Sequence, residues 1–283
     1  MANPMTQSDT TDPAAAHPAL HARSVSVGYE SRTVCQGIDL AIEPGTVTCL
    51  IGPNGSGKST FLKGCARLLD LKGGEVYIEG TAMADLSSIE VARRLAVLPQ
   101  SPTTPPDLTV RELVEQGRYP HVGALRMLRH QDGEAVAAAL EATGMSAFTD
   151  RDVDALSGGE RQRAWIALAL AQETPTLFLD EPTTYLDISY QLEVMHLVQE
   201  LNTTRGITIV MVLHDLNQAA AYSDRVVCLR QGAIVADGTP AEVLTVDLLR
   251  DVFRIEASVI PDPRSGKPVF FPHQPLGAEP NLP

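Results

Sequence analysis

The chain has 283 residues, and its 35 acidic side chains outnumber its 22 Lys and Arg side chains, which gives a formal net charge of −13. Hydrophobic residues make up 44% and charged residues 20%, a balance typical of a folded globular protein and not of a disordered one. No stretch reaches the roughly 18 uninterrupted apolar residues of a membrane span. A chain this acidic repels nucleic-acid phosphates on average, so general nucleic-acid binding is disfavoured.

Both ends of the chain are expected to be irregular. Residues 1–21 are polar and rich in Pro and Ala, without the basic start and apolar block of a secretory signal, and they predict a disordered tail. Residues 261–283 hold seven prolines and predict a second, Pro-rich tail. The four cysteines never pair as C-x-x-C, so we expect buried free thiols and a cytosolic chain. They are Cys35, Cys49, Cys65 and Cys228.

Between the tails, residues 22–260 alternate short apolar runs with helical stretches. The runs are β-branched or Leu-rich, which suits strands that are covered on both faces in a parallel sheet. Helices that join successive strands indicate βαβ units and an α/β fold. The expected strands are Ser24–Tyr29, Thr46–Ile51, Val76–Ile78, Leu95–Leu98, Thr176–Leu179 and Thr208–Leu213, and the expected helices are Ser59–Leu69, Gly158–Ala171 and Ile188–Leu201.

Residues 104–155, approximately, differ from their surroundings because they carry few strand signals. Stretches such as VRELVEQG and EAVAAALEATG have helical character. We therefore expect a helical subdomain inserted into the α/β core. The simpler alternative is a solvated helical insertion without a partner.

The sharpest local pattern fits G-x-x-x-x-G-K-[ST], directly after one apolar strand and at the start of a helix. Its glycines allow positive φ angles that turn backbone N–H groups inward, and the helix N-terminus adds a positive dipole end. This context predicts a triphosphate cradle, with Lys58 on the β- and γ-phosphates and the Ser59 hydroxyl on Mg²⁺. The cradle comprises Gly52, Pro53, Asn54, Gly55, Ser56, Gly57, Lys58, Ser59 and Thr60.

Two carboxylates follow another buried strand, in the run Leu177–Glu181. The carboxyl ends of parallel strands are where doubly wound sheets bind ligands. Beside a phosphate cradle, we expect Asp180 to hold Mg²⁺ through water and Glu181 to polarise the attacking water. An acid pair on the surface is the alternative if the cradle is ignored.

The run Leu156–Gln162 reads LSGGERQ and narrows the class of phosphate-binding protein. Ser157 is suited to cap a helix, and Gly158 and Gly159 expose the first N–H groups of that helix, which makes a second anion site. Taken alone, the run is also consistent with a plain helix start.

In this order, the motifs resemble those of the ATP-binding-cassette (ABC) ATPases over residues 23–250, approximately. Gln100 ends the strand LAVLPQ, where the family has its glutamine loop, and His214 ends TIVMVLH, where the family has its switch histidine. Asp187 matches the D-loop, and Tyr29 matches the aromatic residue that stacks on adenine. The signature reads LSGGE instead of LSGGQ, a departure that leaves the Ser and Gly roles intact.

The resemblance implies a P-loop NTPase core, an inserted helical subdomain that ends in the signature, and an antiparallel β lobe. It also implies hydrolysis of ATP with Mg²⁺ in a head-to-tail dimer. Each ATP would then rest on one cradle and be covered by Ser157 and Gly159 of the second copy. His214 would contact the γ-phosphate, and Gln100 would sense Mg²⁺ and the water.

Finer resemblance comes from three short stretches, namely GRYPH at 117–121, TTYLDI at 183–188 and PRSGKP at 263–268. They resemble the ATPases of bacterial importers for ferric siderophores, haem and vitamin B12, and the siderophore branch fits best. This implies a membrane permease as a partner, a substrate-binding protein as an indirect partner, and a position at the cytoplasmic face of the plasma membrane. The helical subdomain, with the segment after Gln100, should dock a permease helix in an exposed groove.

Two other classes remain as alternatives. A soluble ABC ATPase that acts on nucleic acid or ribosomes usually has two cassettes or a coiled-coil insert, whereas here about a hundred residues separate the cradle from the signature. A P-loop kinase would lack the SGGE run and the switch histidine. The acidic charge and the order of the motifs favour the transport ATPase.

Overall fold

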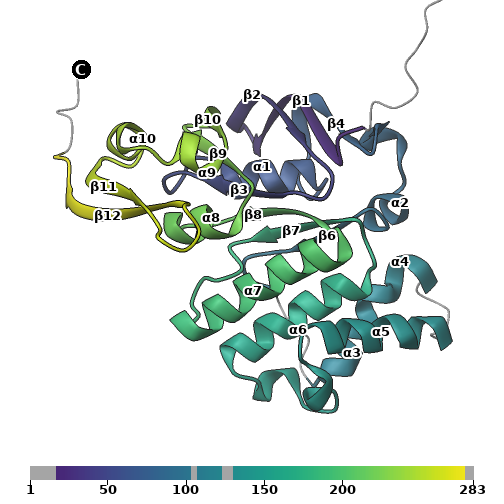
Figure 1. Ribbon diagram of the computed structural model, residues 1–283. Helices are drawn as coiled ribbons and strands as arrows, with labels where there is room; N and C mark the ends of the chain where they lie inside the picture. Colours follow the sequence, from purple (N-terminus) through teal and green to yellow (C-terminus); the bar gives the residue numbers. More distant parts are fainter. Residues whose placement is uncertain (1–16, 103–106, 123–129, 278–283) are drawn as a thin grey trace, which may run out of the picture.

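The computed structural model describes residues 17–102, 107–122 and 130–277 (Figure 1). Most of the expected N-terminal tail, residues 1–16, lies outside the described residues. The end of that expected tail is structured, because Leu20 and His21 already pair with the neighbouring strand as part of β1. The boundary predicted at residue 22 is therefore wrong by two residues.

The central sheet has six strands in the order β10-β9-β3-β8-β7-β6. The pairs from β9 through β6 are parallel, as the βαβ pattern predicts, and β10 is antiparallel to β9. The strands are β3 (Val47–Ile51), β6 (Leu95–Leu98), β7 (Thr176–Asp180), β8 (Thr208–Val212), β9 (Arg225–Arg230) and β10 (Ala233–Gly238).

Every residue of β3, β7 and β8 is buried, because this sheet is covered on both faces. Alternate side chains enter different hydrophobic clusters, as the two-residue period of a strand requires. In β7, Phe178 packs into the cluster below the β lobe, whereas Leu177 and Leu179 pack into the cluster under the helices. All four cysteines are buried free thiols, which confirms that prediction.

A second sheet forms the antiparallel lobe, in the order β2-β1-β4-β5. Its strands are β1 (Leu20–Tyr29), β2 (Arg32–Ile42), β4 (Leu71–Ile78) and β5 (Thr81–Ala82). Helix α1 (Lys58–Cys65) fills the space between the two sheets, where Phe61 and Leu62 join the same cluster as Val25 and Val27. The short elements η1 (Met83–Asp85) and α2 (Ser88–Ala92) lead from this lobe to β6.

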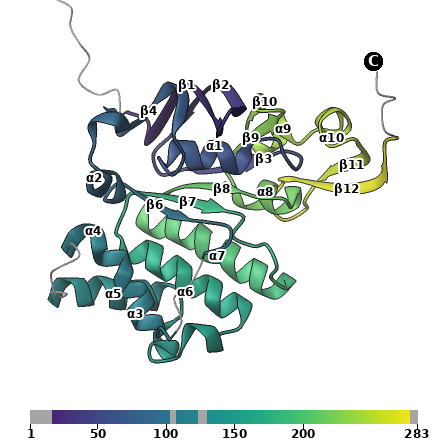
Figure 2. The same cartoon turned by 180° about the vertical axis from the view of Figure 1, so that it is seen from behind.

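Helices gather on the other face of the central sheet, as Figures 1 and 2 show. They are α3 (Val110–Glu115), η2 (Gln116–Arg118), α4 (Tyr119–Val122), α5 (His130–Ala142), η3 (Ser146–Phe148), η4 (Val153–Ala155), α6 (Gly158–Ala171) and α7 (Ile188–Arg205). Buried Arg118 of the GRYPH stretch ties this lobe together, because its guanidinium bonds Asp132 and the Ala171 carbonyl at the end of α6. Within the described ranges, no helix combines the length and the apolar character needed to cross a bilayer.

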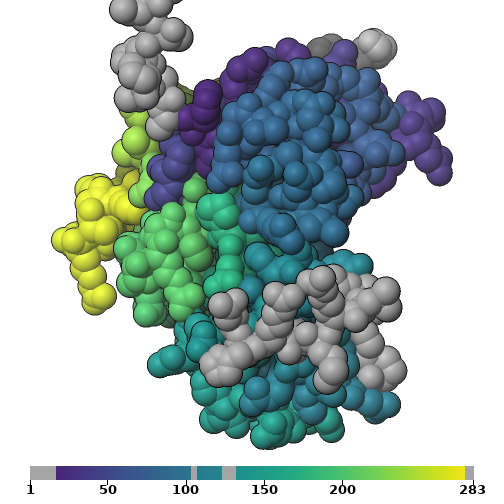
Figure 3. Space-filling view, turned by 90° about the vertical axis from the view of Figure 1, so that its right-hand side faces the viewer, coloured from purple at the N-terminus to yellow at the C-terminus, as the bar shows by residue number. Residues whose placement is uncertain are grey.

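The C-terminal part contains α8 (Leu216–Tyr222), α9 (Pro240–Val243), α10 (Val246–Asp251), β11 (Ile255–Pro261) and β12 (Pro268–Pro275). Strands β11 and β12 form an antiparallel hairpin that lies to one side of the core (yellow in Figures 1 and 3). The expectation that the chain is irregular after Pro261 is therefore wrong for β12. Prolines are tolerated here because Pro261, Pro268 and Pro275 lie at strand ends of a two-stranded sheet, and Pro272, inside β12, lies beside an irregularity in the pairing with β11. Residues 278–283 of the expected tail lie outside the described residues.

Candidate functional site

The phosphate cradle joins β3 to α1 and has the backbone that its glycines predict. Gly52, Gly55 and Gly57 all have positive φ, at 144°, 78° and 103°. A Cβ on Gly52 would lie 2.1 Å from the Leu229 carbonyl oxygen, and a Cβ on Gly57 would lie 2.6 Å from the Cys35 sulfur. A larger residue at Gly52 would force a shift of the backbone, and one at Gly57 would displace the buried Cys35 side chain and strain its own positive φ.

Lys58 is almost fully buried at the mouth of this loop. Its ammonium donates hydrogen bonds to the carbonyl oxygens of Gly52, at 2.8 Å, and of Pro53, at 3.2 Å. Burial lowers the pKa of Lys58, and the nearby Glu181 carboxylate opposes that shift. An ammonium that donates its hydrogen bonds to neutral carbonyls is well placed to exchange them for anionic phosphate oxygens.

Asp180 ends β7 and is 1% exposed. The Ser59 hydroxyl donates to its Oδ1 at 2.6 Å, which brings together the two residues expected to serve Mg²⁺. Its Oδ2 is buried and has no hydrogen-bond partner in the described part of the chain, although the Lys63 ammonium lies 4.0 Å away. Burial raises the pKa of Asp180, and the Ser59 hydrogen bond partly offsets that shift. A hydroxyl oxygen beside a buried, unsatisfied carboxylate oxygen fits a small divalent cation that prefers oxygen ligands.

Glu181 is the point where three separate motifs meet. The Gln100 amide donates to its Oε2 at 2.5 Å, and His214 Nε2 lies 2.6 Å from its Oε1. The Thr184 hydroxyl donates to Oε2 at 3.1 Å. Gln100, Glu181 and His214 follow β6, β7 and β8, which are neighbours in the sheet, so their side chains meet at one edge.

The backbone of Glu181 is also unusual, with a left-handed φ of 56° that an extended strand end does not adopt. Its N–H donates to the Val212 carbonyl at 3.2 Å, which anchors the turn to β8. Non-glycine residues in this region cost about 1–3 kcal/mol and persist where the surroundings hold them, often at functional sites.

A cavity of about 160 Å³ opens at this edge of the sheet. It is lined by Asn54, Gly55, Gly57, Lys58, Ser59, Thr60, Glu181 and His214. The cradle groups that can donate hydrogen bonds to phosphate thus lie across the cavity from the Glu181 carboxylate, which can accept a hydrogen bond from water. This arrangement can bind a triphosphate and activate water against its terminal phosphorus.

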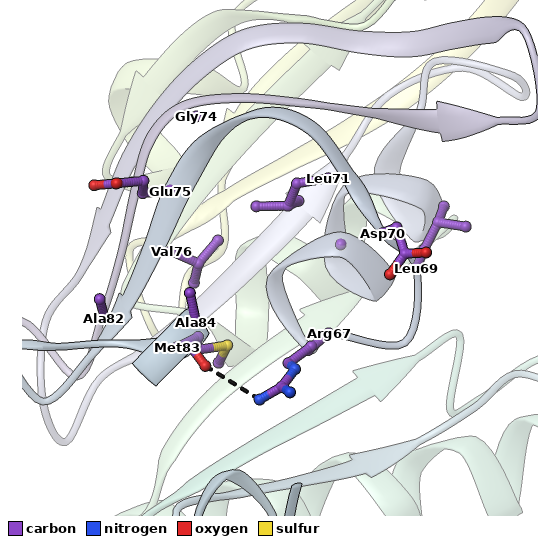
Figure 4. A pocket seen from close by; sticks show the side chains of 11 residues that line it. Arg67, Leu69, Asp70, Leu71, Gly74, Glu75, Val76, Ala82, Met83 and Ala84 are labelled. Atoms are coloured by element: carbon purple, nitrogen blue, oxygen red, sulfur yellow. Dashed lines mark hydrogen bonds between the residues drawn. The ribbon is translucent and has the colours of Figure 1, made fainter. Parts of the chain in front are cut away.

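A different cavity, of about 280 Å³, lies at the C-terminal end of α1 under β4 and η1 (Figure 4). Its wall is mostly apolar, and the Arg67 guanidinium donates to the Met83 carbonyl at its border. Its titratable side chains Arg67, Asp70 and Glu75 all lie in described residues and make no hydrogen bond or ion pair with one another, so we place the chemistry at the P-loop.

The signature run is built as a helix start, as expected. Ser157 caps α6 in a reciprocal capping box with Glu160, in which its hydroxyl accepts from the Glu160 N–H at 3.3 Å and its own N–H donates to that carboxylate at 2.8 Å. A Cβ on Gly159 would lie 2.3 Å from the Tyr190 ring, so this glycine allows close packing of α6 against α7. Neither Ser157 nor Gly159 lines the P-loop cavity.

Eight further expected site residues also lie outside the lining of that cavity, namely Gly52, Pro53, Ser56, Gln100, Asp180, Asp187, Gly158 and Tyr29. The first five belong to the cradle and the sheet edge described above. Asp187 is the N-cap residue of α7, without a side-chain cap hydrogen bond. Gly158 begins α6 beside the Leu186 side chain. Tyr29 ends β1 and is 49% exposed, as a residue available for stacking must be. Their roles toward a nucleotide stay predictions.

Comparison with known families agrees with this geometry. The family model described as ABC transporter matches residues 35–184, from β2 through the turn after Glu181. The chain belongs to the ABC transporter family. Its catalytic activity is accordingly that of an ABC ATPase, the activity that the sequence motifs indicate.

Curated relatives of this ABC protein match it over nearly its whole length. The iron(3+)-hydroxamate import ATP-binding protein FhuC of Bacillus subtilis is 44% identical, over 93% of this chain and 98% of the relative. The ferric enterobactin transport ATP-binding protein FepC of Escherichia coli is 46% identical, over 89% and 93%. The hemin import ATP-binding protein HmuV of Streptomyces coelicolor is 42% identical, over 89% of each chain.

Solved structures confirm the ABC fold. An inward-facing metal-chelate type ABC transporter chain superposes with a TM-score of 0.79 at 24% identity, over 91% of this chain and 98% of the other. A dimeric ATP-binding cassette in a post-hydrolysis state, bound to ADP and phosphate, superposes with a TM-score of 0.69 at 29% identity, over 78% and 98%.

Thr184 is a site residue that the sequence reasoning missed. It follows Glu181 by three residues in the turn after β7, and its N–H also donates to the Glu181 carbonyl at 3.3 Å. A hydroxyl three positions after an acid in a tight turn is the available signal, because such side chains bond locally. Its contact with Oε2 makes Thr184 the third side chain that holds the Glu181 carboxylate.

Proposed function

We propose that this ABC ATPase powers the import of an iron chelate of the siderophore type through a partner permease, at the cytoplasmic face of the plasma membrane. The observation that carries the ATPase role is the convergence of Gln100 and His214 on Glu181 beside the P-loop. The siderophore cargo is supported by relatives such as FhuC and FepC, which match almost from end to end. Haem is the second candidate, because the HmuV relative is 42% identical.

Each part of the proposed hydrolytic step is assigned to particular residues of this chain. Lys58 and the cradle N–H groups bind the triphosphate, and Ser59 and Asp180 would hold Mg²⁺. Mg²⁺, when bound, neutralises charge on the phosphate oxygens. Glu181 accepts a hydrogen bond from the attacking water and takes its proton, which sharpens the oxygen as a nucleophile. His214 and Gln100, now paired with Glu181, would turn toward the γ-phosphate and the water.

The active form that we propose is a head-to-tail dimer in which Ser157 and Gly159 of a second copy cover the nucleotide. Support comes from the signature, which is fully formed within one chain yet contributes nothing to the lining of that chain's P-loop cavity. A helix N-terminus is a ready anion site, so a second copy would supply the positive potential that a triphosphate requires. A related cassette is dimeric with ADP and phosphate.

For the permease we propose a groove of about 360 Å³ beside β6, the strand that leads to Gln100. Leu68, Val91 and Val97 are among the residues that line it. Leu68 is 61% exposed and Tyr119 of the GRYPH stretch is 55% exposed, so apolar surface is available at this side of the molecule. A permease helix seated here would touch the strand that ends at the catalytic edge.

Deletion and complementation test the cargo. The host strain that lacks this chain should fail to grow when a ferric siderophore is the sole iron source. The wild-type chain should restore growth, whereas Lys58→Ala, which loses the buried phosphate-binding ammonium, should not. Growth on haem iron should be unaffected. Loss of growth on haem alone, with siderophore growth intact, would contradict the siderophore assignment in favour of haem.

A further inference from the structure

The stretch PRSGKP at 263–268 lies in the turn of the C-terminal hairpin, far along the chain from every residue of the catalytic edge. The hairpin, β11 and β12, nevertheless packs against α8, and α8 begins two residues after His214. This packing gives the stretch a mechanical connection to the switch histidine.

The position of His214 depends on α8. Asp215, directly after His214, is the N-cap residue, and its carboxylate accepts from the N–H groups of Asn217, at 2.8 Å, and Gln218, at 3.0 Å. These bonds fix the start of α8 directly after His214, so the His214 backbone and the first turn of the helix move together. A shift of α8 therefore moves the imidazole relative to Glu181, from which it is now 2.6 Å.

Helix α8 has only seven residues, so its place is set by tertiary contacts and not by its own helical stability. Leu216, Ala219 and Ala220 bury one side of it in the core. On another side, Gln218 donates to Gln191 at 2.6 Å, which ties α8 to α7.

The hairpin holds α8 at two further points. The Asn217 side chain pairs with the backbone of Phe270 in β12, accepting from its N–H at 2.9 Å and donating to its carbonyl at 3.3 Å. The Lys267 ammonium, from the PRSGKP stretch, donates to the carbonyls of Ala221, at 2.7 Å, and Ser223, at 3.1 Å. A cation on the last carbonyls of a helix also complements the negative end of its dipole.

The same helix is linked to the turn that follows Glu181. The Thr183 hydroxyl donates to the Gln218 side chain at 3.3 Å, and the Gln191 amide donates to the Leu186 carbonyl at 2.9 Å. Helix α8 therefore lies between the hairpin and the Thr183–Asp187 turn, with polar contacts on both sides. The hairpin supports the element on which the alignment of His214 with Glu181 depends.

We propose that the C-terminal hairpin is a positioning element for His214, with Asn217 and Lys267 as the positioning residues. It aligns the imidazole for turnover and leaves ATP binding at the P-loop untouched, because neither residue lines the P-loop cavity. The inference rests on the proposed role of His214.

The test measures steady-state ATPase activity of the full chain, with kcat expressed per ATP-binding molecule after titration of the sites with a fluorescent ATP analogue. Asn217→Ala should lower kcat about tenfold with KM for ATP unchanged, since misplacement of a reacting group by about 1 Å costs up to a hundredfold. Lys267→Ala should lower kcat about threefold. Lys267→Arg, which keeps a cation and several donors, should restore wild-type kcat.

The matched control is Gln274→Ala, because Gln274 bonds Glu256 across the same hairpin and makes no hydrogen bond to α8. It should keep wild-type kcat. His214→Ala is assayed in parallel to separate the two proposals. Wild-type turnover by His214→Ala would overturn the role of His214 itself. A defective His214→Ala beside Asn217→Ala and Lys267→Ala that turn over within twofold of wild type would overturn the positioning role of the hairpin, as would a loss of binding-competent molecules with unchanged kcat per site.

Discussion

The P-loop side and the signature side of this ABC protein differ in how much of a nucleotide site one chain completes. On the P-loop side, side chains from separate elements already contact one another, as Ser59 contacts Asp180 and as Gln100 and His214 contact Glu181. On the signature side, Ser157 bonds only its own helix start. Contacts across the sheet edge thus bring together the groups that we propose for hydrolysis, whereas local capping shapes the signature.

The difference shows that a segment can be fully folded within one chain and still lack the partner groups of a complete nucleotide site. The capping box satisfies the first turn of α6 without any ligand, so the signature needs no second chain to fold. In the dimer that we propose, it meets a phosphate that is bound to a second chain. Three variants and one labelling experiment should therefore separate effects on chemistry from effects on folding, in decreasing order of expected size.

The largest effect is expected for Glu181→Gln on the P-loop side. The amide keeps the shape of the side chain but cannot take a proton from water, so turnover should fall by about 10²–10⁴-fold. ATP binding should persist, and gel filtration with ATP should show more dimer than for the wild type. Wild-type turnover by this variant would contradict the role of Glu181 as the base.

On the signature side, Ser157→Ala should lower turnover at least about tenfold if a second copy presents that hydroxyl to the nucleotide. Ser87→Ala is the matched control, because Ser87 caps α2 in a capping box with the same hydrogen-bond distances, 3.3 Å and 2.8 Å. Both variants should lose about 1 kcal/mol of folding stability. Equal turnover by the two, with equal stability loss, would mean that Ser157 serves its helix alone.

A smaller, pH-dependent effect is expected for Asp180→Asn. Burial raises the pKa of Asp180 above its ordinary value of 3.8, so the folded state holds the proton more tightly than the unfolded chain. The stability that protonation confers is present at low pH and is lost as the pH rises through the raised pKa. Without nucleotide, Asp180→Asn should therefore resist urea better than the wild type at pH 8, and the difference should shrink toward acidic pH. Added ATP and Mg²⁺ should stabilise the wild type more than the variant, which keeps the cradle but lacks the carboxylate proposed for Mg²⁺.

The smallest effect concerns thiol labelling on the P-loop side. Burial raises the pKa of Cys35, whose sulfur donates to the Gly57 carbonyl at 3.4 Å, to about 11, and does the same for Cys228. At pH 8 only about one thiol in a thousand would then be ionised, so alkylation of the native chain should be slow at these positions and fast after unfolding. Mass spectrometry of the labelled peptides checks this. Rapid labelling of Cys35 in the native chain would show that the packing around the cradle opens readily.

Much of the fold follows from local sequence. Buried parallel strands such as Thr176–Asp180 are recognisable in the sequence as continuous apolar runs. The cradle is recognisable from glycines whose φ angles few other residues adopt. Strand β2 was not predicted, because register shifts in its pairing with β1, around Gly37, break the two-residue alternation of buried and exposed side chains. The β11–β12 hairpin was not predicted, because the number of prolines in a segment does not reveal which of them lie at strand ends.

The site divides in the same way. The residue types and spacing predict Lys58, Asp180 and Glu181, because the cradle and the acid pair each lie at the carboxyl end of one buried strand. Which side chains meet Glu181 depends on the order of strands in the sheet, and that order is a tertiary property. Thr184 and the link from Asn217 to the hairpin therefore become visible only in three dimensions.

The helical subdomain leaves the core after β6 and returns to it at β7, and these two strands lie side by side. An insertion whose entrance and exit are neighbours can pivot as one body about two adjacent hinges without disturbing the strand register of the sheet. Gln100 lies two residues after β6, the strand from which the chain enters the lobe, and its side chain contacts Glu181. A displacement of the lobe that moved Gln100 would therefore reach the Glu181 carboxylate directly.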